Sequence, residues 1–275
     1  MIPVELPDQI LYAPLQPWLE RGVVTLDALN ADAASRGLVT GTGLPLRFES
    51  PTADGMSYEA RAFQTGLVET RSDNWHDLFG AWIWLAFPKA KAAMNLRHWQ
   101  AMAEEQGARG LVRDALTQFD ECGVVVLCTD VSLWEGIRAH RWREVFVERR
   151  ADVARHLRFL VFGHGSLDAL RTPFVGLCGK ALCFQVAELP EAIGDQLVLA
   201  DELLAGFLLG EAELHPRRWQ PLPLLGIPGV TPENEAAEYY EDTRQFRPLS
   251  PVQSAPEVRQ AIAVSLAESR KVRAP

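Results

Sequence analysis

The stretch that decides the fold is Glu69–His98, which reads ETRSDNWHDLFGAWIWLAFPKAKAAMNLRH. Ser72 or Asp73 is a suitable N-cap for a helix over about residues 74–87. That helix is apolar on every face, which is typical of a helix buried inside a large core. Its tryptophans are therefore best explained as core residues.

Pro88 has to end or kink this first helix, because proline lacks the amide hydrogen of the helix interior. It is also well placed as the first residue of a second, amphipathic helix from Lys89 to about Gln106, closed by Gly107. An antiparallel pair joined at Pro88 would bring the ends carrying residues 76 and 98 close together. The stretch thus predicts two consecutive helices at the centre of the molecule.

The composition is that of a soluble globular protein. Of 275 residues, 48% are hydrophobic and 23% charged, and the formal net charge of -9 disfavours a nucleic acid as partner. The longest near-continuous apolar run, Leu78–Phe87, is too short for a membrane span, which needs about 20 residues, and no signal peptide pattern is present. The four cysteines lie among apolar residues, so we expect buried, reduced thiols in a cytoplasmic protein.

The rest of the chain predicts a mixture of short elements. Seven prolines between Pro216 and Pro251 exclude regular helix or central strand, while the aromatic residues among them predict that this segment wraps the core. We expect one α+β domain over residues 1–251, mostly helical, with a β-hairpin or small sheet and a proline-rich C-terminal wrap; residues 252–275 form a loosely ordered tail. Its other expected elements are extended segments at Leu44–Phe48 and Tyr58–Val68, a hairpin over Ala115–Thr129, one long helix over 148–170, a strand over Leu177–Val186 and a helix over Glu188–Gly210.

The first candidate site is the polar run Asp73–Asp77 at the mouth of the apolar helix. Titratable groups in apolar surroundings cost free energy unless they are paired, so they need a reason. His76 and Asp77, with His98 on the next helix, offer the neutral imidazole and carboxylate donors that metals prefer. The alternative is structural: the aspartates favour the positive N-terminus of the helix, and His76 makes a buried hydrogen bond.

Two further segments carry candidate groups. Asp114, Asp120 and Glu121 flank the expected hairpin and reach the same pocket if it folds back on the first site, although a hairpin turn with Asp120 and Gly123 explains the residues more simply. His164 lies between Gly163 and Gly165, and each glycine costs a helix about 1 kcal/mol relative to alanine. The glycines indicate a close approach to His164, either of a ligand or of a packed neighbouring helix.

Several motifs resemble an uncharacterised bacterial family known as domain of unknown function 3025. They are Asn74–Phe79, Phe87–Lys89, Asn95–His98, Arg113–Thr117, Phe119–Glu121, Phe162–His164, Pro173–Leu177, Gly226–Gly229 and Asp242–Pro248. The similarity covers most of residues 58–248, and the expected continuation after the histidine is an alanine-containing helix where this chain has Gly165–Ser166. The resemblance implies a single-domain bacterial protein without an assigned activity. It also implies a polar signature composed of His76, Asp77, His98, Asp114, Asp120, Glu121 and His164.

Two hypotheses follow, and the sequence leaves both open. In the first, the protein is a metal-assisted hydrolase or a related enzyme that acts on a small molecule. Its metal ligands would be His76, Asp77, His98 and His164, its general base Asp114, Asp120 or Glu121, and its cofactor a divalent transition metal. In the second, the protein is a non-catalytic binding or assembly protein, and the buried polar groups lock the helix packing.

Overall fold

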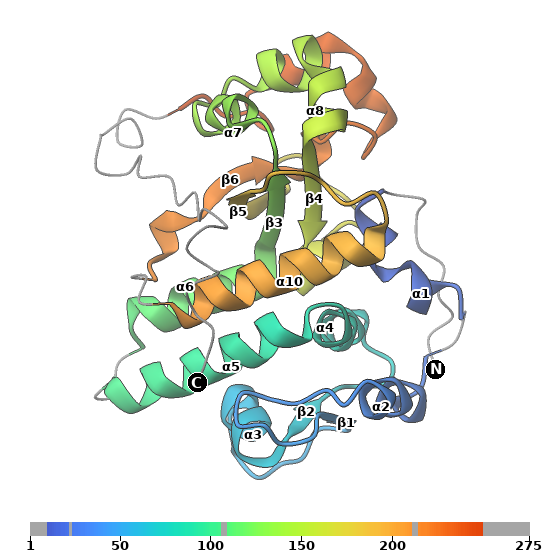
Figure 1. Ribbon diagram of the computed structural model, residues 1–275, viewed down its shortest axis with the longest axis vertical. Coiled ribbons are helices and arrows are strands. Elements are labelled where there is room, and N and C mark those ends of the chain that lie inside the picture. The colour runs from blue at the N-terminus through green and yellow to red at the C-terminus, as the bar shows by residue number, and fades with distance from the viewer. Residues whose placement is uncertain (1–9, 22–23, 106–108, 211–213, 250–275) are drawn as a thin grey trace.

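A computed structural model describes residues 10–21, 24–105, 109–210 and 214–249. Its centre is a four-stranded sheet in the order β4-β3-β5-β6 (Figure 1). β3 pairs in parallel with β5 and antiparallel with β4, and every residue of β3 is buried, so this strand forms the axis of the core. The strands are β3 (Gly123–Cys128), β4 (Leu157–Val161), β5 (Cys178–Gln185) and β6 (Gln220–Pro223).

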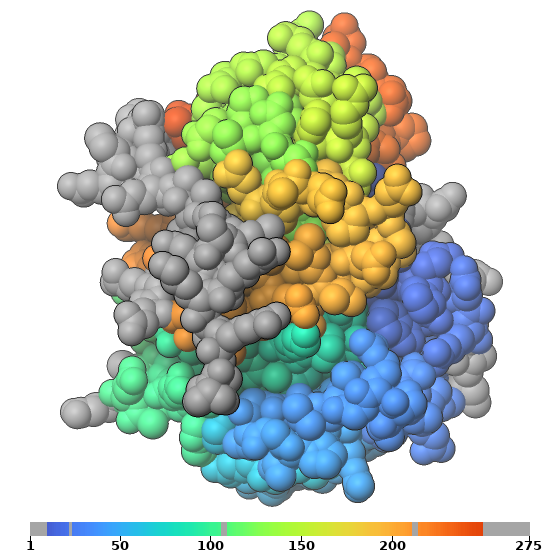
Figure 2. Space-filling model, viewed as in Figure 1, coloured from blue at the N-terminus to red at the C-terminus, as the bar shows by residue number. Residues whose placement is uncertain are grey.

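Helices cover the sheet and build a second layer below it (Figure 1). α10 lies alongside α5, and the space-filling view shows α10 running across the middle of the molecule (Figure 2). The helices of this layer are α4 (Trp75–Ala86), α5 (Pro88–Glu104), α6 (Leu111–Cys122), α9 (His164–Ala169) and α10 (Ile193–Leu209). None of the helices within the described ranges is long and apolar enough to cross a membrane.

The remaining elements lie around the sheet and this helical layer. α2 (Leu26–Ser35), α3 (Tyr58–Thr65) and the parallel pair of β1 (Arg47–Glu49) with β2 (Leu67–Glu69) form one end. Elsewhere lie η1 (Ile10–Leu15), α1 (Gln16–Leu19), α7 (Val131–Arg138), the π-helical turn η2 (Glu144–Glu148), α8 (Arg150–His156) and the 3-10 turns η3 (Pro216–Arg218), η4 (Leu224–Gly226), η5 (Pro232–Glu235) and η6 (Ala237–Glu241).

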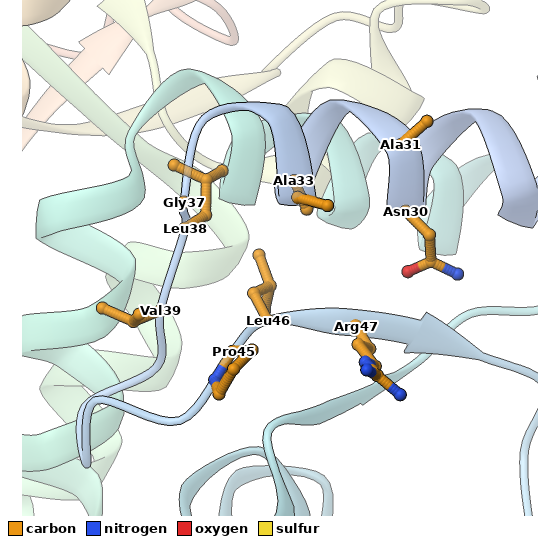
Figure 3. A pocket seen from close by; sticks show the side chains of 10 residues that line it. Asn30, Ala31, Ala33, Gly37, Leu38, Val39, Pro45, Leu46 and Arg47 are labelled. Atoms are coloured by element: carbon orange, nitrogen blue, oxygen red, sulfur yellow. The ribbon is translucent and has the colours of Figure 1, made fainter.

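An apolar hollow of about 670 Å³ lies between α2 and the segment leading into β1 (Figure 3). Arg47 is the one charged residue in its lining, and the side chain of Asn30 is bonded to the backbone of Phe48. The hollow therefore offers shape but no group that would perform chemistry.

The central prediction, two helices separated at Pro88, is confirmed. α4 is buried from Leu78 onward, and α5 begins at Pro88 itself. The N-cap of α4 is Asn74 rather than Ser72 or Asp73, and its side chain accepts a hydrogen bond from the Asp77 amide. The expected antiparallel pairing is wrong, because α4 is seen nearly end-on while α5 runs across the view (Figure 1). The closure at Gly107 lies outside the described residues.

The mixed, mostly helical α+β architecture is confirmed with a small sheet, but the hairpin over Ala115–Thr129 is wrong. Its first half is the helix α6, whose Ala115, Leu116 and Phe119 recur with helical spacing and are fully buried. The antiparallel partner of β3 is instead β4, about thirty residues further along the chain. The strand over Leu177–Val186 is confirmed as β5.

Two other expected elements also differ. Tyr58–Thr65 is helical because Ser57 caps it and Gly66, at φ +77°, ends it in the left-handed region. The single helix over 148–170 is interrupted by β4. The proline-rich segment wraps the core as expected, and its one strand, β6, lies at the sheet edge, where proline is tolerated. Residues 252–275 lie outside the described ranges.

Candidate metal centre

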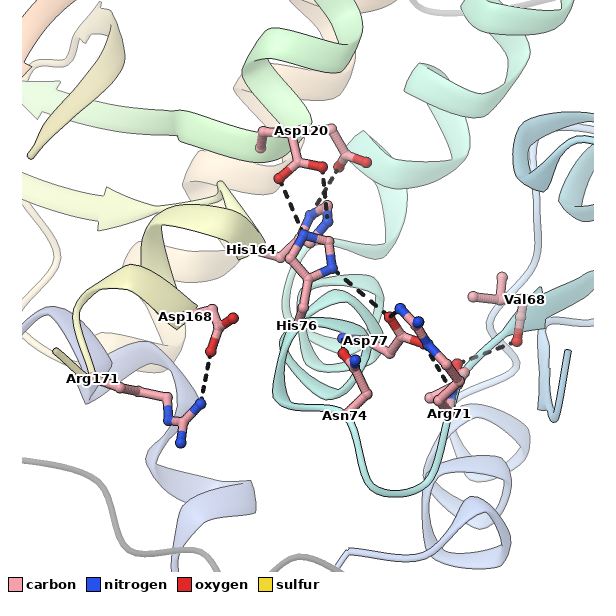
Figure 4. A network of polar contacts seen from close by, with 11 residues as sticks. Val68, Arg71, Asn74, His76, Asp77, Asp120, His164, Asp168 and Arg171 are labelled. Carbon is pink, nitrogen blue, oxygen red and sulfur yellow. Dashed lines mark hydrogen bonds and ion pairs between the residues drawn. The ribbon is translucent and has the colours of Figure 1, made fainter.

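Three elements bring two histidines and a glutamate together. Figure 4 shows the two histidines, His76 and His164, side by side. His76 lies in the first turn of α4, Glu121 near the end of α6 and His164 at the start of α9. Oε2 of Glu121 lies 3.2 Å from Nε2 of His76, and Oε1 of Glu121 lies 3.5 Å from Nε2 of His164. The two imidazole rings meet edge to face, with their centres 4.4 Å apart.

Glycines account for how closely α9 approaches the end of α6. A Cβ at Gly163 would lie within 2.6 Å of the backbone of Cys122 and Gly123. A Cβ at Gly165 would overlap the carboxylate of Glu121. The close approach to His164 expected from its flanking glycines is therefore present, and at Gly165 the space is taken by the Glu121 carboxylate.

A second carboxylate lies behind each histidine. Nδ1 of His76 is 3.8 Å from Oδ1 of Asp77, and Nδ1 of His164 is 3.9 Å from Oδ1 of Asp120. Arg71 holds Asp77 through its backbone amide, Nε and Nη2. Metal-ligating histidines commonly have such carboxylates behind the ring, where they fix its orientation.

The charges of the cluster are unevenly distributed. The hydrogen bond to Glu121 raises the pKa of His76, and the same bond lowers the pKa of Glu121. Burial lowers the pKa of His164, which favours its neutral form. The cluster thus contains a carboxylate and a neutral imidazole, which are the protonation states in which these groups bind metals.

The geometry suits a metal ion with an open coordination side. One donor atom from each of His76, Glu121 and His164 lies within 4.8 Å of the other two. A tetrahedral site with ligand bonds of about 2.1 Å separates its ligands by about 3.4 Å, so small side-chain rotations suffice. The side chains of His76 and Glu121 are 40% and 42% exposed, whereas that of His164 is 12% exposed. The cluster is therefore closed behind His164 and open to solvent beside the other two.

The remaining predicted residues take different places relative to this cluster. His98 is buried in α5; burial lowers its pKa to about 4, and its Nδ1 has no hydrogen-bond partner in the described structure. Asp114 forms an ion pair with Arg109. It precedes Asp120 by six residues, which is about 9 Å along the axis of α6. Asp77 and Asp120 lie behind the histidines, in a supporting place. Glu121, predicted as a base, lies among the donor atoms.

Two residues near the cluster were not found from the sequence. Lys91 is buried and bonded to Asp120, yet in the sequence it resembles an ordinary solvent-facing helix lysine. Asp168 follows His164 by four residues on α9, and its Oδ1 lies 2.9 Å from Nη1 of Arg171. The four-residue spacing, which places His164 and Asp168 on one face of a helix, was a signal available in the sequence.

The chain belongs to a family described as "Protein of unknown function (DUF3025)", whose model matches residues 47–250. This match confirms the family resemblance, and every candidate residue lies inside the matched range. No curated protein and no solved structure matches the chain. The family assigns no reaction, so the chemistry of the site has to be argued from its geometry.

Proposed function

We propose that this member of the family binds one divalent transition metal ion between His76, Glu121 and His164 and uses it to hydrolyse a small-molecule substrate. The observation that carries the proposal is the convergence of two imidazoles and one carboxylate from three separate elements. Each imidazole has a carboxylate behind it, as ligand histidines do. The four free cysteines accord with the reducing cytoplasm of a bacterium as the place of action.

Two nitrogens and one carboxylate are the donor set of hydrolytic zinc sites and also of Fe(II) centres. In a hydrolase the metal would lower the pKa of a bound water, which requires an open position. The half-exposed side of the cluster, formed by His76 and Glu121, provides that opening. Hydrolysis, whose metal needs three protein ligands and one free position, is therefore compatible with the cluster.

The general base, in this proposal, is Asp168. Asp120 lies behind His164, Glu121 is a ligand, and Asp114 lies about 9 Å along α6 from Asp120, so their positions exclude them as the base. Asp168 lies on the side of His76 away from Arg71 (Figure 4), and its charge contributes to raising the pKa of His76. Arg171, whose guanidinium lies 4.4 Å from the ring centre of Trp75, holds Asp168 in place.

The test is elemental analysis of protein purified without a chelator or a histidine tag. We expect about one transition metal ion per chain, and its loss in His76→Ala. His156→Ala is the matched control, because His156 bonds to Thr129 away from the cluster and its variant should keep the metal. Measuring all transition metals together identifies which ion the site takes.

The alternative, a binding or assembly protein with purely structural polar groups, predicts a different outcome. The metal site would be contradicted if the purified protein is metal-free and takes up no metal on dialysis against zinc or iron(II). In that case His76→Ala should only unfold at a lower temperature than the wild type. Metal retained in His76→Ala but lost in His156→Ala would place the site elsewhere.

A further inference from the structure

A buried lysine lies directly behind the cluster. Lys91 is 3% exposed, and its Nζ lies 2.6 Å from Oδ1 of Asp120. The ammonium group sits 5.2 Å from the ring centre of Trp84 and 5.9 Å from that of Phe162, within cation–π range of both. Lys91 is thus enclosed by aromatic rings on one side and bonded to a single carboxylate on the other.

A buried ion pair of this kind contributes little net stability to a protein core. Taking two charges out of water costs several kcal/mol per ion, and apolar residues of similar volume often give equal or better stability. The pair therefore needs a reason beyond stability. The atom of Asp120 that Lys91 holds, Oδ1, is the same atom that lies 3.9 Å from Nδ1 of His164.

The surroundings of the two ring nitrogens of His164 suggest the reason. Nδ1 of His164 is buried and has no hydrogen-bond partner in the described structure, while its Nε2 lies 3.5 Å from Glu121. A modest ring rotation converts the Asp120 contact into a hydrogen bond, which requires the proton to be on Nδ1. Nε2 is then the unprotonated atom, and it is the one that points into the cluster.

We propose that Lys91 is a positioning residue: it fixes the Asp120 carboxylate so that His164 keeps its proton on Nδ1 and presents Nε2 beside Glu121. The consequence for metal affinity rests on the proposed function, whereas the tautomer of His164 does not. Lys91 touches neither the metal nor a substrate in this arrangement, and it acts only through Asp120.

The test uses the metal-free protein with ¹⁵N-labelled histidine and long-range ¹H–¹⁵N correlation spectra, which report the tautomer of each ring. We expect the Nδ1–H tautomer for His164 in the wild type and a mixture of tautomers in Lys91→Met. Lys89→Met is the matched control, since Lys89 lies on the same helix but pairs with exposed Glu202. His164→Gln, which lacks the ring, assigns the signal.

Lys91→Met leaves a buried carboxylate unpaired and can unfold the protein, so a second variant is required. Lys91→Met/Asp120→Leu removes both charges and should recover the thermal stability that Lys91→Met loses. A purely structural role of the pair predicts this recovery and no other change. The positioning role predicts that His164 stays in mixed tautomers in this folded double variant, and that metal binds about 10–100-fold more weakly than in the wild type.

Three results would overturn the inference. They are an unchanged His164 tautomer in the double variant, a change in the His98 ring in place of His164, and zinc affinity of the double variant within twofold of the wild type. If no variant and no wild-type protein binds metal, the proposed function fails, and the tautomer measurement still decides the role of Lys91.

Discussion

At the residue scale, two glycines border the cluster, and only one of them is required by the space around it. A Cβ at Gly165 would overlap the Glu121 carboxylate, whereas a Cβ at Gly80 would meet the His164 ring at 3.8 Å, an ordinary contact. Gly80 therefore has no steric reason to be glycine in the interior of α4, whereas Gly165 leaves room for the carboxylate of Glu121, the proposed metal ligand.

We predict opposite effects for alanine at these two positions. Gly165→Ala should displace Glu121 and weaken metal binding by about tenfold or more, comparable to the loss of an outer-shell partner. Gly80→Ala should bind metal as the wild type does and gain up to about 1 kcal/mol of stability from helix propensity. Isothermal titration with zinc and urea unfolding measure the two quantities. Equal metal affinity in both variants would show that Glu121 is not a ligand.

The same residues show how far the sequence leads. His76, Glu121 and His164 were all among the candidates, since titratable groups beside apolar runs are unusual enough to be noticed. Their individual places were not predictable, because Glu121 meets the two histidines only when α6 is a helix that ends at the sheet. Lys91 was missed because its partner, Asp120, is 29 residues away in the chain, and nothing local distinguishes a buried lysine from an exposed one.

At the element scale, the proline boundary and the long apolar run predicted correctly, whereas two segments of mixed propensity were assigned the wrong structure. Pro88 and the apolar run of α4 specify a boundary and a buried helix regardless of the surroundings. The segments at Tyr58–Thr65 and Ala115–Cys122 contain both helix and strand formers, so tertiary packing decides between the two. In α3, buried Arg61 is stabilised by the acidic Asp54, Glu49 and Glu69, which come from outside the helix.

The junction of α5 and α10 shows how two such elements are held together. Asp201 of α10 is buried and accepts hydrogen bonds from the backbone amides of Lys89 (3.1 Å) and Ala90 (2.7 Å). These are among the amides that the first turn of a helix leaves unpaired, and Phe87, the N-cap of α5, provides no side-chain cap. An aspartate from another helix therefore caps α5.

This junction predicts a pH dependence of stability. Burial raises the pKa of Asp201 to about 6, above the value of about 3.9 in an unfolded chain. Between pH 4 and pH 6 the folded protein holds a proton that the unfolded chain has lost, so the free energy of unfolding falls as pH rises through this window. Relative to Asp201→Asn, the wild type should gain ~2 kcal/mol between pH 7 and pH 4.5. Urea unfolding across this range measures the difference, and a constant difference would refute the assignment.

At the scale of the whole molecule, the cluster is a junction of parts that are distant in the chain. Its three donors come from residues 76, 121 and 164, on α4, α6 and α9, and α9 packs against both of the other helices. An unfolded chain does not hold these donors together, so a metal that binds here binds the folded state. Metal binding should therefore act on the stability of the entire domain.

Thermal unfolding of chelator-treated protein measures this linkage. A ligand at 100 times its dissociation constant adds about 2.7 kcal/mol to the free energy of unfolding, which in a domain of this size raises the midpoint by roughly 5–10 °C. Wild type and Gly80→Ala should both show the rise when zinc is added, whereas His76→Ala should not. Gly165→Ala should need about tenfold more zinc for the same rise, since its donors are displaced but present. A midpoint independent of metal in the wild type would mean that α4, α6 and α9 are held by packing and ion pairs alone, and the His76–Glu121 bond would then be a structural contact.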